Sequence, residues 1–222
     1  MTMPRGLVLL ASLWIFASWE LSIGLRPPAI ASVASYLPGV RLMIACLAVG
    51  LCAGWPLLRL SGPRERWPML RVIVDLIALA ALVHVVLWPL RLATTWPPAR
   101  LALMDLLLFG WAGVGGAFVA AAIGSSSARA RTLAMAACLT VTALGLPVRL
   151  ATTSLGLPEP PPWALGPVLG CLALGSPEGA ADAHRQWPGA AIVACLAVLC
   201  WGVAWWLVRS RRAQVAPLPA HG

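Results

Sequence analysis

Six runs of about 20 mainly apolar residues limit the fold of this chain more than any other feature. A run of this length crosses a bilayer as an α-helix, because a helix satisfies all of its backbone polar groups internally. Since 60% of the residues are hydrophobic and only 10% are charged, lipid rather than water must be the solvent for most of the chain. The predicted spanning helices are 6–24, 40–60, 70–91, 101–123, 131–150 and 189–208.

A seventh apolar stretch, at 163–175, is too short to cross a bilayer and carries the pair Gly166-Pro167. We therefore expect it to be re-entrant or interfacial. Residues 1–212 are predicted to form one all-α domain, a polytopic transmembrane bundle of six spanning helices plus this short segment. Residues 213–222 are predicted to be a disordered cytoplasmic tail. The first run begins like a signal peptide, but it lacks a clear cleavage site, so we interpret it as a retained helix and keep a signal peptide as the alternative.

Arginine supplies all 16 basic residues, and its distribution predicts the orientation of the bundle. Basic residues are enriched in cytoplasmic loops. With six crossings, the N-terminus, the 59–71 loop, the 124–131 loop and the tail share the more basic side. We therefore predict a bacterial inner-membrane protein with both termini in the cytoplasm. The net charge of +9 does not indicate nucleic-acid binding, because the arginines are spread between apolar segments. The expected partners are the lipid bilayer and a protein in a membrane complex.

The sequence Arg-Leu-Ala-Thr-Thr occurs twice, in PLRLATTW at 89–96 and in PVRLATTS at 147–154. Six crossings place both copies on the outer side, each at the end of a helix. In the structural interpretation, proline frees a backbone carbonyl near the helix end and threonine hydroxyls satisfy such groups. In the functional interpretation, Arg91 and Arg149 are cations of an outer vestibule that attract an anionic ligand.

Ionisable side chains inside transmembrane helices are costly and mark candidate functional sites. Asp75 follows Arg71 by one turn, so a salt bridge between them is expected. Asp105 similarly follows Arg100, as its neighbouring cation, near the outer start of its helix, where the helix dipole also favours a carboxylate. His84 has no charged neighbour in the sequence and must face another helix or a cavity. The intramembrane candidates are Glu20, Asp75, His84 and Asp105.

Sulfur-containing side chains suggest a path for copper. Thioether and thiol groups favour Cu(I), and two segments place one of each on the same helix face. The alternative is that these residues only fill tight helix interfaces. Copper is expected as a transported ion and not as a bound cofactor, and we find no motif that indicates an enzyme. The predicted metal path consists of Met43, Cys46, His84, Met104, Met135 and Cys138.

One part of the chain resembles a known family. In RLALMDLLLFGWAGVGGAF, at 100–118, the residues Arg100, Asp105, Phe109 and Gly110 are similar to the first transmembrane helix of the copper-resistance D family of inner-membrane proteins. The sequence that follows, from 131 to 154, resembles the second helix of that family. The resemblance covers about 100–155 and implies copper handling, although the histidine-bearing downstream helices of the family have no counterpart here.

Three functions are compatible with these features. The first is transport or handling of a small solute, most concretely copper, with Arg100 and Asp105 at the outer mouth of the path. The second is a membrane subunit of an ABC-2-type transporter, with the segment 58–71 as the docking site for an ATPase. The third is a non-catalytic assembly or scaffold subunit of a membrane redox complex.

Overall fold

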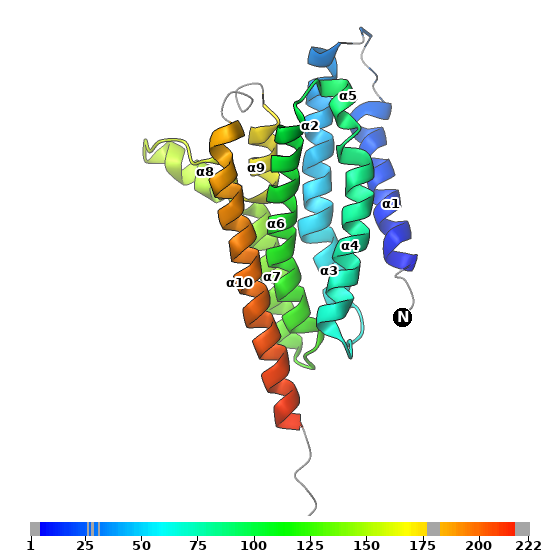
Figure 1. The fold of residues 1–222 in the computed structure, drawn as a ribbon, viewed down its shortest axis with the longest axis vertical. Helices are drawn as coiled ribbons and strands as arrows, with labels where there is room; N and C mark the ends of the chain where they lie inside the picture. The colour runs from blue at the N-terminus through cyan, green and yellow to red at the C-terminus, as the bar shows by residue number, and fades with distance from the viewer. Residues whose placement is uncertain (1–4, 26, 28, 31, 177–182, 216–222) are drawn as a thin grey trace, which may run out of the picture.

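The computed structural model describes residues 5–25, 27, 29–30, 32–176 and 183–215, which form an elongated helical bundle (Figure 1). No β-strand occurs in these ranges. The elements in chain order are α1 (Arg5–Trp19), η1 (Glu20–Gly24), α2 (Val33–Val49), η2 (Gly50–Gly54), α3 (Trp55–Ser61), α4 (Pro68–Leu87), α5 (Leu90–Thr94), α6 (Pro98–Ile123), α7 (Ala128–Ala143), α8 (Gly145–Ser154), η3 (Pro162–Leu165), α9 (Gly166–Leu174) and α10 (Ala183–Val215).

Five continuous helical segments are long and apolar enough to cross a membrane, and a bent pair of helices makes a sixth. The bent pair is α7 and α8, whose axes differ by 49°. These segments confirm an all-α polytopic transmembrane bundle, and the chain is a multi-pass membrane protein. The five continuous segments are Arg5–Gly24, Val33–Ser61, Pro68–Thr94, Pro98–Ile123 and Arg185–Arg211.

Two boundaries differ from the prediction by the largest number of residues. The second span begins at Val33 instead of residue 40, because Ser32 and Ser35 form a reciprocal capping box. The Ser35 backbone N–H donates to Ser32 Oγ at 3.2 Å, and the Ser32 N–H donates to Ser35 Oγ at 3.1 Å. At the other end of the chain, α10 continues to Val215, into the predicted tail. The rest of that tail lies outside the described residues.

Both copies of the repeated motif lie at the same end of the bundle, in α5 and α8 (Figure 1). The first copy ends the span Pro68–Thr94, after a short turn at Trp88 and Pro89. The second copy lies in α8, beyond the bend that separates α8 from α7. Proline favours such irregularities because it lacks the N–H that would continue the helix. Thr94 Oγ1 donates to the Leu90 carbonyl at 2.9 Å, and Thr152 Oγ1 donates to the Arg149 carbonyl at 3.0 Å. These hydrogen bonds support the structural interpretation of the motif.

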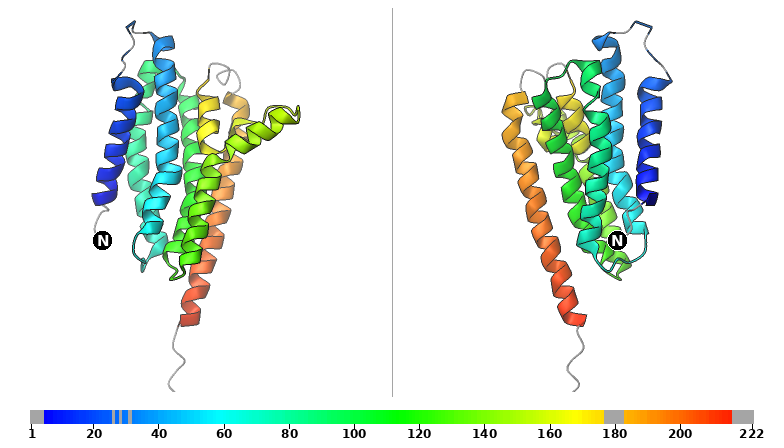
Figure 2. Two further views of the ribbon diagram at one scale, coloured as in Figure 1. Left: turned by 180° about the vertical axis from the view of Figure 1, so that it is seen from behind. Right: turned by 45° about the vertical axis from the view of Figure 1, so that its right-hand side comes forward.

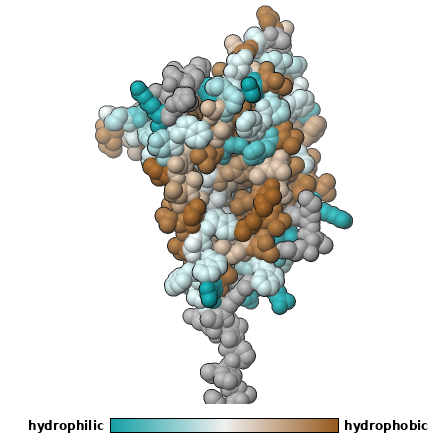
Figure 3. Space-filling view, viewed as in Figure 1, coloured by the Kyte–Doolittle hydropathy of each residue, from teal (hydrophilic) through white to brown (hydrophobic). Residues whose placement is uncertain are grey.

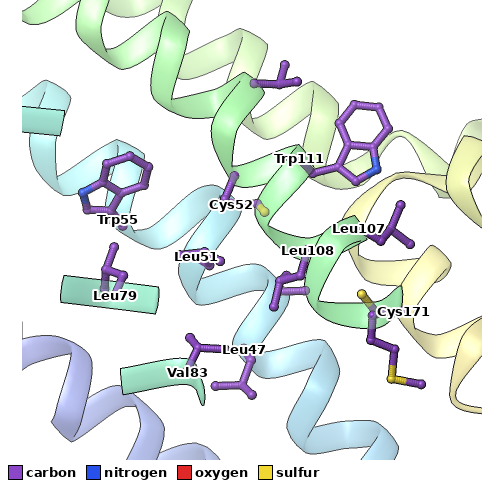
Figure 4. Close-up of a cluster of buried hydrophobic side chains, with 14 of the residues drawn as sticks. Leu47, Leu51, Cys52, Trp55, Leu79, Val83, Leu107, Leu108, Trp111 and Cys171 are labelled. Carbon is purple, nitrogen blue, oxygen red and sulfur yellow. The ribbon is translucent and has the colours of Figure 1, made fainter. Parts of the chain in front are cut away.

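Helix α6 forms the centre of the bundle. In its apolar stretch 72% of the residues are buried, compared with 17% in the span of α10 and 6% in the span that α1 begins. The small residues of α6 allow this position. A Cβ atom on Gly110 would lie 3.0 Å from Val193 Cγ1 of α10, and one on Gly113 would lie 3.1 Å from Ala197 Cβ. Leu107, Leu108 and Trp111 of α6 face the side chains of η2 and α9 in the core (Figure 4).

The short segment formed by η3 and α9 enters and leaves the bundle at the end where α5 and α8 lie (Figures 1 and 2). It packs against α2, α6 and α7, and about half of α9 is buried in protein. Irregular backbone at membrane depth is tolerated only in such surroundings. The segment 163–175 is thus a short helix packed among longer ones, and the choice between a re-entrant and an interfacial position stays a prediction.

The first residue of α1 and the last of α10 lie at the other end of the bundle, as six crossings require (Figure 1). We call this the basic end, because many of the described arginines lie at it. The opposite end carries α5 and α8. In the space-filling view, strongly hydrophilic residues lie toward the upper and lower parts of the molecule and apolar residues cover much of the middle (Figure 3). The arginines of the basic end are Arg5, Arg59, Arg64, Arg66, Arg71, Arg129, Arg131, Arg209 and Arg211.

Candidate functional site

The candidate site lies where α4 packs against α6. His84 and Trp88 are four residues apart at the end of α4, and Asp105 and Phe109 are four residues apart on α6. Residues with this spacing share one face of a helix. Each helix therefore contributes one aromatic residue and one ionisable residue to the same contact.

The carboxylate of Asp105 is the centre of this contact. His84 Nε2 lies 2.7 Å from Asp105 Oδ2, and the indole N–H of Trp88 donates to the same oxygen at 3.2 Å. The imidazole also stacks on Phe109, with ring centroids 5.6 Å apart and an angle of 23° between the ring planes. Two helices thus hold the imidazole and the carboxylate in a defined orientation.

The hydrogen-bond partners of His84 show how many protons the site holds. Its Nδ1 lies 2.8 Å from the Ala80 carbonyl, which only accepts hydrogen bonds, so Nδ1 carries a hydrogen. With the hydrogen on Nδ1, a neutral imidazole has only a lone pair at Nε2, and an ionised Asp105 Oδ2 also has only lone pairs. A hydrogen bond between these two atoms therefore requires one further hydrogen. The pair is either an imidazolium with a carboxylate or a neutral imidazole with a carboxylic acid. In both cases it binds one exchangeable proton and has no net charge.

The site is open on one side and closed on the other. The His84 side chain is 47% exposed at the surface of the bundle, whereas that of Asp105 is 12% exposed. The second carboxylate oxygen, Oδ1, is buried and receives no hydrogen bond from any residue within the described ranges. Asp105 therefore keeps an oxygen atom that can accept a proton or contact a cation.

Asp105 does not pair with Arg100 as the sequence suggested. The two residues are five positions apart, so their side chains leave the helix in directions that differ by about 140°. The guanidinium of Arg100 donates instead to the Leu174 carbonyl at 2.6 Å and to the Ser176 carbonyl, and it lies 4.9 Å from the Trp96 ring. Arg100 thus binds the C-terminal end of α9, where a cation is favoured by the helix dipole.

Arg100→Met is expected to loosen α9 and to lower the free energy of unfolding by about 2 kcal/mol, since hydrogen bonds from a charged donor each contribute a comparable amount. Thermal unfolding of the purified protein measures the loss. Cys171 in α9 is 1% exposed, so its labelling by a membrane-permeant thiol reagent should rise in the same variant. The control is Arg149→Met. The Arg149 side chain is 61% exposed, and its replacement removes a surface ion pair with Glu159 at 3.7 Å, which contributes little to stability. Equal labelling of Cys171 in both variants would rule out this role of Arg100.

Asp75 occupies a second buried polar contact, between α3 and α4. Arg59 binds it with two nitrogens, Nε to Oδ2 and Nη2 to Oδ1 at 2.6 Å, and Trp55 Nε1 donates to Oδ2 at 3.3 Å. The predicted partner Arg71 is present but more distant, with its Nε 3.8 Å from Oδ1. Asp75 has no exposed surface, and both of its oxygens are satisfied. This geometry indicates a structural ion pair that joins α3 to α4.

Arg91 and Arg149, the predicted cation pair, belong to α5 and α8. These two helices lie at the same end of the bundle but on opposite sides of it (Figures 1 and 2). Arg91 lines a surface pocket with Trp88 and Trp96. The structure therefore does not bring the two arginines into one vestibule.

The predicted metal path is distributed over four helices. Met43 and Cys46 lie on α2, His84 on α4, Met104 on α6, and Met135 and Cys138 on α7. Met43, Met104 and Cys138 are buried, and both ring nitrogens of His84 already have protein partners. In the parts of the chain that the structure describes, no three His, Cys, Asp or Glu side chains lie close enough to hold a metal ion. The copper path stays a prediction.

Four neighbours of these groups were not predicted from the sequence. Trp88 binds Asp105, Phe109 stacks on His84, and Trp55 and Arg59 bind Asp75. The signal that would have found them is the spacing of four residues between a polar and an aromatic side chain, which occurs in HVVLW, DLLLF and WPLLR.

The fold and this site define a multi-pass membrane protein with an intramembrane carboxylate–imidazole pair. Comparison of the chain with models of protein families, with curated proteins and with solved structures finds no match. The similarity of residues 100–155 to the copper-resistance D family accordingly stays a prediction.

Proposed function

We propose that the protein is a carrier that exchanges a proton for a small cation at the Asp105–His84 pair. The observation that supports this is the 2.7 Å contact between His84 Nε2 and Asp105 Oδ2, combined with the Nδ1 contact to the Ala80 carbonyl. Removal of the shared proton leaves a neutral imidazole and a carboxylate, with a net charge of −1. A negative charge at this depth is costly, so a cation is favoured as its replacement.

The surroundings of the pair fit this exchange. Oδ1 of Asp105 is buried and has no hydrogen-bond donor among the described residues, so it is available to a cation. The half-exposed imidazole gives the pair a route to the surface of the bundle. One site therefore binds either ion, and binding of one displaces the other.

Copper(I) is the cation that we propose, and this choice rests on the sequence. Met104 precedes Asp105 in α6, and its thioether is a soft ligand suited to Cu(I). Thiols and thioethers on α2 and α7 supply further soft groups. We further propose that the basic end faces the cytoplasm of a bacterial cell, since basic residues are enriched on that side.

Proton movement in proteoliposomes tests the proposal. Vesicles that contain the purified protein and a pH-sensitive dye receive Cu(I) on one side only. We expect copper-dependent proton movement with the wild type, and at least a tenfold lower rate with Asp105→Asn or His84→Gln, because neither variant retains the carboxylate–imidazole pair that shares the proton. Each variant is first shown to unfold at a temperature close to that of the wild type.

Met104→Leu is the matched control, since this swap nearly conserves side-chain volume and leaves the proton site intact. It should weaken the dependence on copper while a pH gradient still drives proton movement. Proton movement that is unchanged in Asp105→Asn would refute the exchange mechanism. Proton movement that depends on Asp105 but responds equally to Na⁺ would refute copper as the cation.

A further inference from the structure

An apolar cavity of about 430 Å³ lies between α1, the η2–α3 segment and α4. Its walls include Leu10 and Trp14 of α1, Leu51 of η2 and Val83 of α4. Cavities of roughly 300–1,000 Å³ typically hold small ligands. In the close-up of the core, Leu47, Trp55, Leu79 and Val83 gather on one side of the α2–η2 segment, away from Trp111 and Cys171 (Figure 4).

The helices around the cavity are arranged to leave this space. Helix α1 is the least buried of the continuous spans, and the five-residue π-helix η2 widens the chain at Gly50–Gly54. Single-turn π-helices are frequent at functional sites. The indole N–H of Trp14 donates to the Cys46 carbonyl at 3.0 Å and so ties α1 to α2 beside the cavity.

The length of the cavity matches one leaflet of a bilayer. Its lining on α1 runs from Leu7 to Ala17, which corresponds to about 15 Å along a helix that rises 1.5 Å per residue. The hydrocarbon core of a bilayer is about 30 Å thick, so each leaflet contributes half of that distance. A single acyl chain that enters from the basic end therefore reaches the far end of the cavity.

Charge at the basic end indicates which lipid supplies the chain. Arg5 lies in the first turn of α1, beside the cavity residue Leu7, and its side chain is exposed. Arg64 is also exposed and donates to the Gly124 carbonyl at 3.0 Å. The acidic residues at this end are Glu65, whose partner is Arg71, and the fully paired Asp75. Basic side chains at a membrane surface attract anionic headgroups.

We propose that this cavity binds one acyl chain of an anionic phospholipid, with the phosphate of the headgroup facing the arginines of the basic end. Lipid binding here is independent of the proton site, because the cavity and the Asp105–His84 pair share no residue. The lipid fills the space that α1 leaves and fixes α1 to the bundle.

Native mass spectrometry tests the proposal with the full chain reconstituted in vesicles of equal parts phosphatidylglycerol and phosphatidylcholine. We expect one retained phosphatidylglycerol per chain. Gly54→Phe should lower its retention at least fivefold, since the nearest atom to a Cβ at Gly54 is 3.9 Å away and the new ring fills the cavity. Ala11→Phe should do the same from the opposite wall. The matched control is Gly202→Phe on α10. Gly202 does not line the cavity, and a Cβ atom there would meet no other atom within 4 Å.

Two results would overturn the proposal. Equal retention of lipid by the wild type, Gly54→Phe and Ala11→Phe would show that the cavity is not the binding site. Equal retention of phosphatidylcholine and phosphatidylglycerol by the wild type would show that charge at the basic end selects nothing. Arg5→Gln combined with Arg64→Gln is expected to lower the preference for phosphatidylglycerol while one lipid is still retained.

Discussion

Asp75→Leu is expected to lower the free energy of unfolding by about 3–5 kcal/mol, which is the usual cost of removing one partner from a buried ion pair. The carboxylate has no exposed surface and binds Arg59 through both of its oxygens. Without it, the guanidinium of Arg59 and the N–H of Trp55 lose their acceptor inside the membrane. Thermal and denaturant unfolding of the purified protein in detergent micelles measure the change.

The double variant Arg59→Met with Asp75→Leu separates the ion pair from simple packing. Replacement of both partners of a buried pair by apolar side chains is often neutral or stabilising, so the double variant should recover most of the lost stability. Glu65→Gln is the surface control, because Glu65 lies 3.8 Å from Arg71 and both side chains are partly exposed. A double variant as unstable as Asp75→Leu alone would show that the charge left on Arg59 is not the cause.

The spanning helices were predictable because the length of an apolar run and the thickness of a bilayer are directly related. Glycine and alanine in the segment 112–124 fit the central position of α6, since small residues permit close packing. The position of the breaks was harder to predict. The motif at 89–96 was placed at the end of a long helix, whereas α4 ends at Leu87 and a separate short helix follows.

The candidate site was predictable only one residue at a time. Asp75, His84 and Asp105 were identified because ionisable groups are rare inside a membrane. Their partners were assigned from neighbours in the sequence, which gave Arg100 for Asp105. The actual partner, His84, is 21 positions away and reaches Asp105 only because α4 packs against α6. Contacts of this kind depend on helix rotation, which an almost uniformly apolar sequence does not specify.

Asp105→Asn is expected to remove the shared proton, because a carboxamide cannot hold a proton between itself and His84 as a carboxylate does. His84 and Trp88 both meet one oxygen of Asp105. An asparagine can place its N–H₂ toward His84 or its oxygen toward Trp88, but one atom cannot serve both partners. One hydrogen bond is therefore lost, at a cost of about 1 kcal/mol, so the variant should fold while proton exchange is lost. Side-chain ¹⁵N NMR of the histidine-labelled protein in lipid vesicles measures the protonation of the ring.

This NMR measurement tests the central claim most directly, and His84→Gln identifies the signals of His84 by their disappearance. For the wild type, we predict a protonated Nδ1 and an Nε2 signal that reports a proton shared with Asp105. For Asp105→Asn, we predict an Nε2 signal that no longer reports a shared proton. An Nε2 signal that is identical in the wild type and Asp105→Asn across the pH range would contradict the shared proton, and with it the proposed exchange.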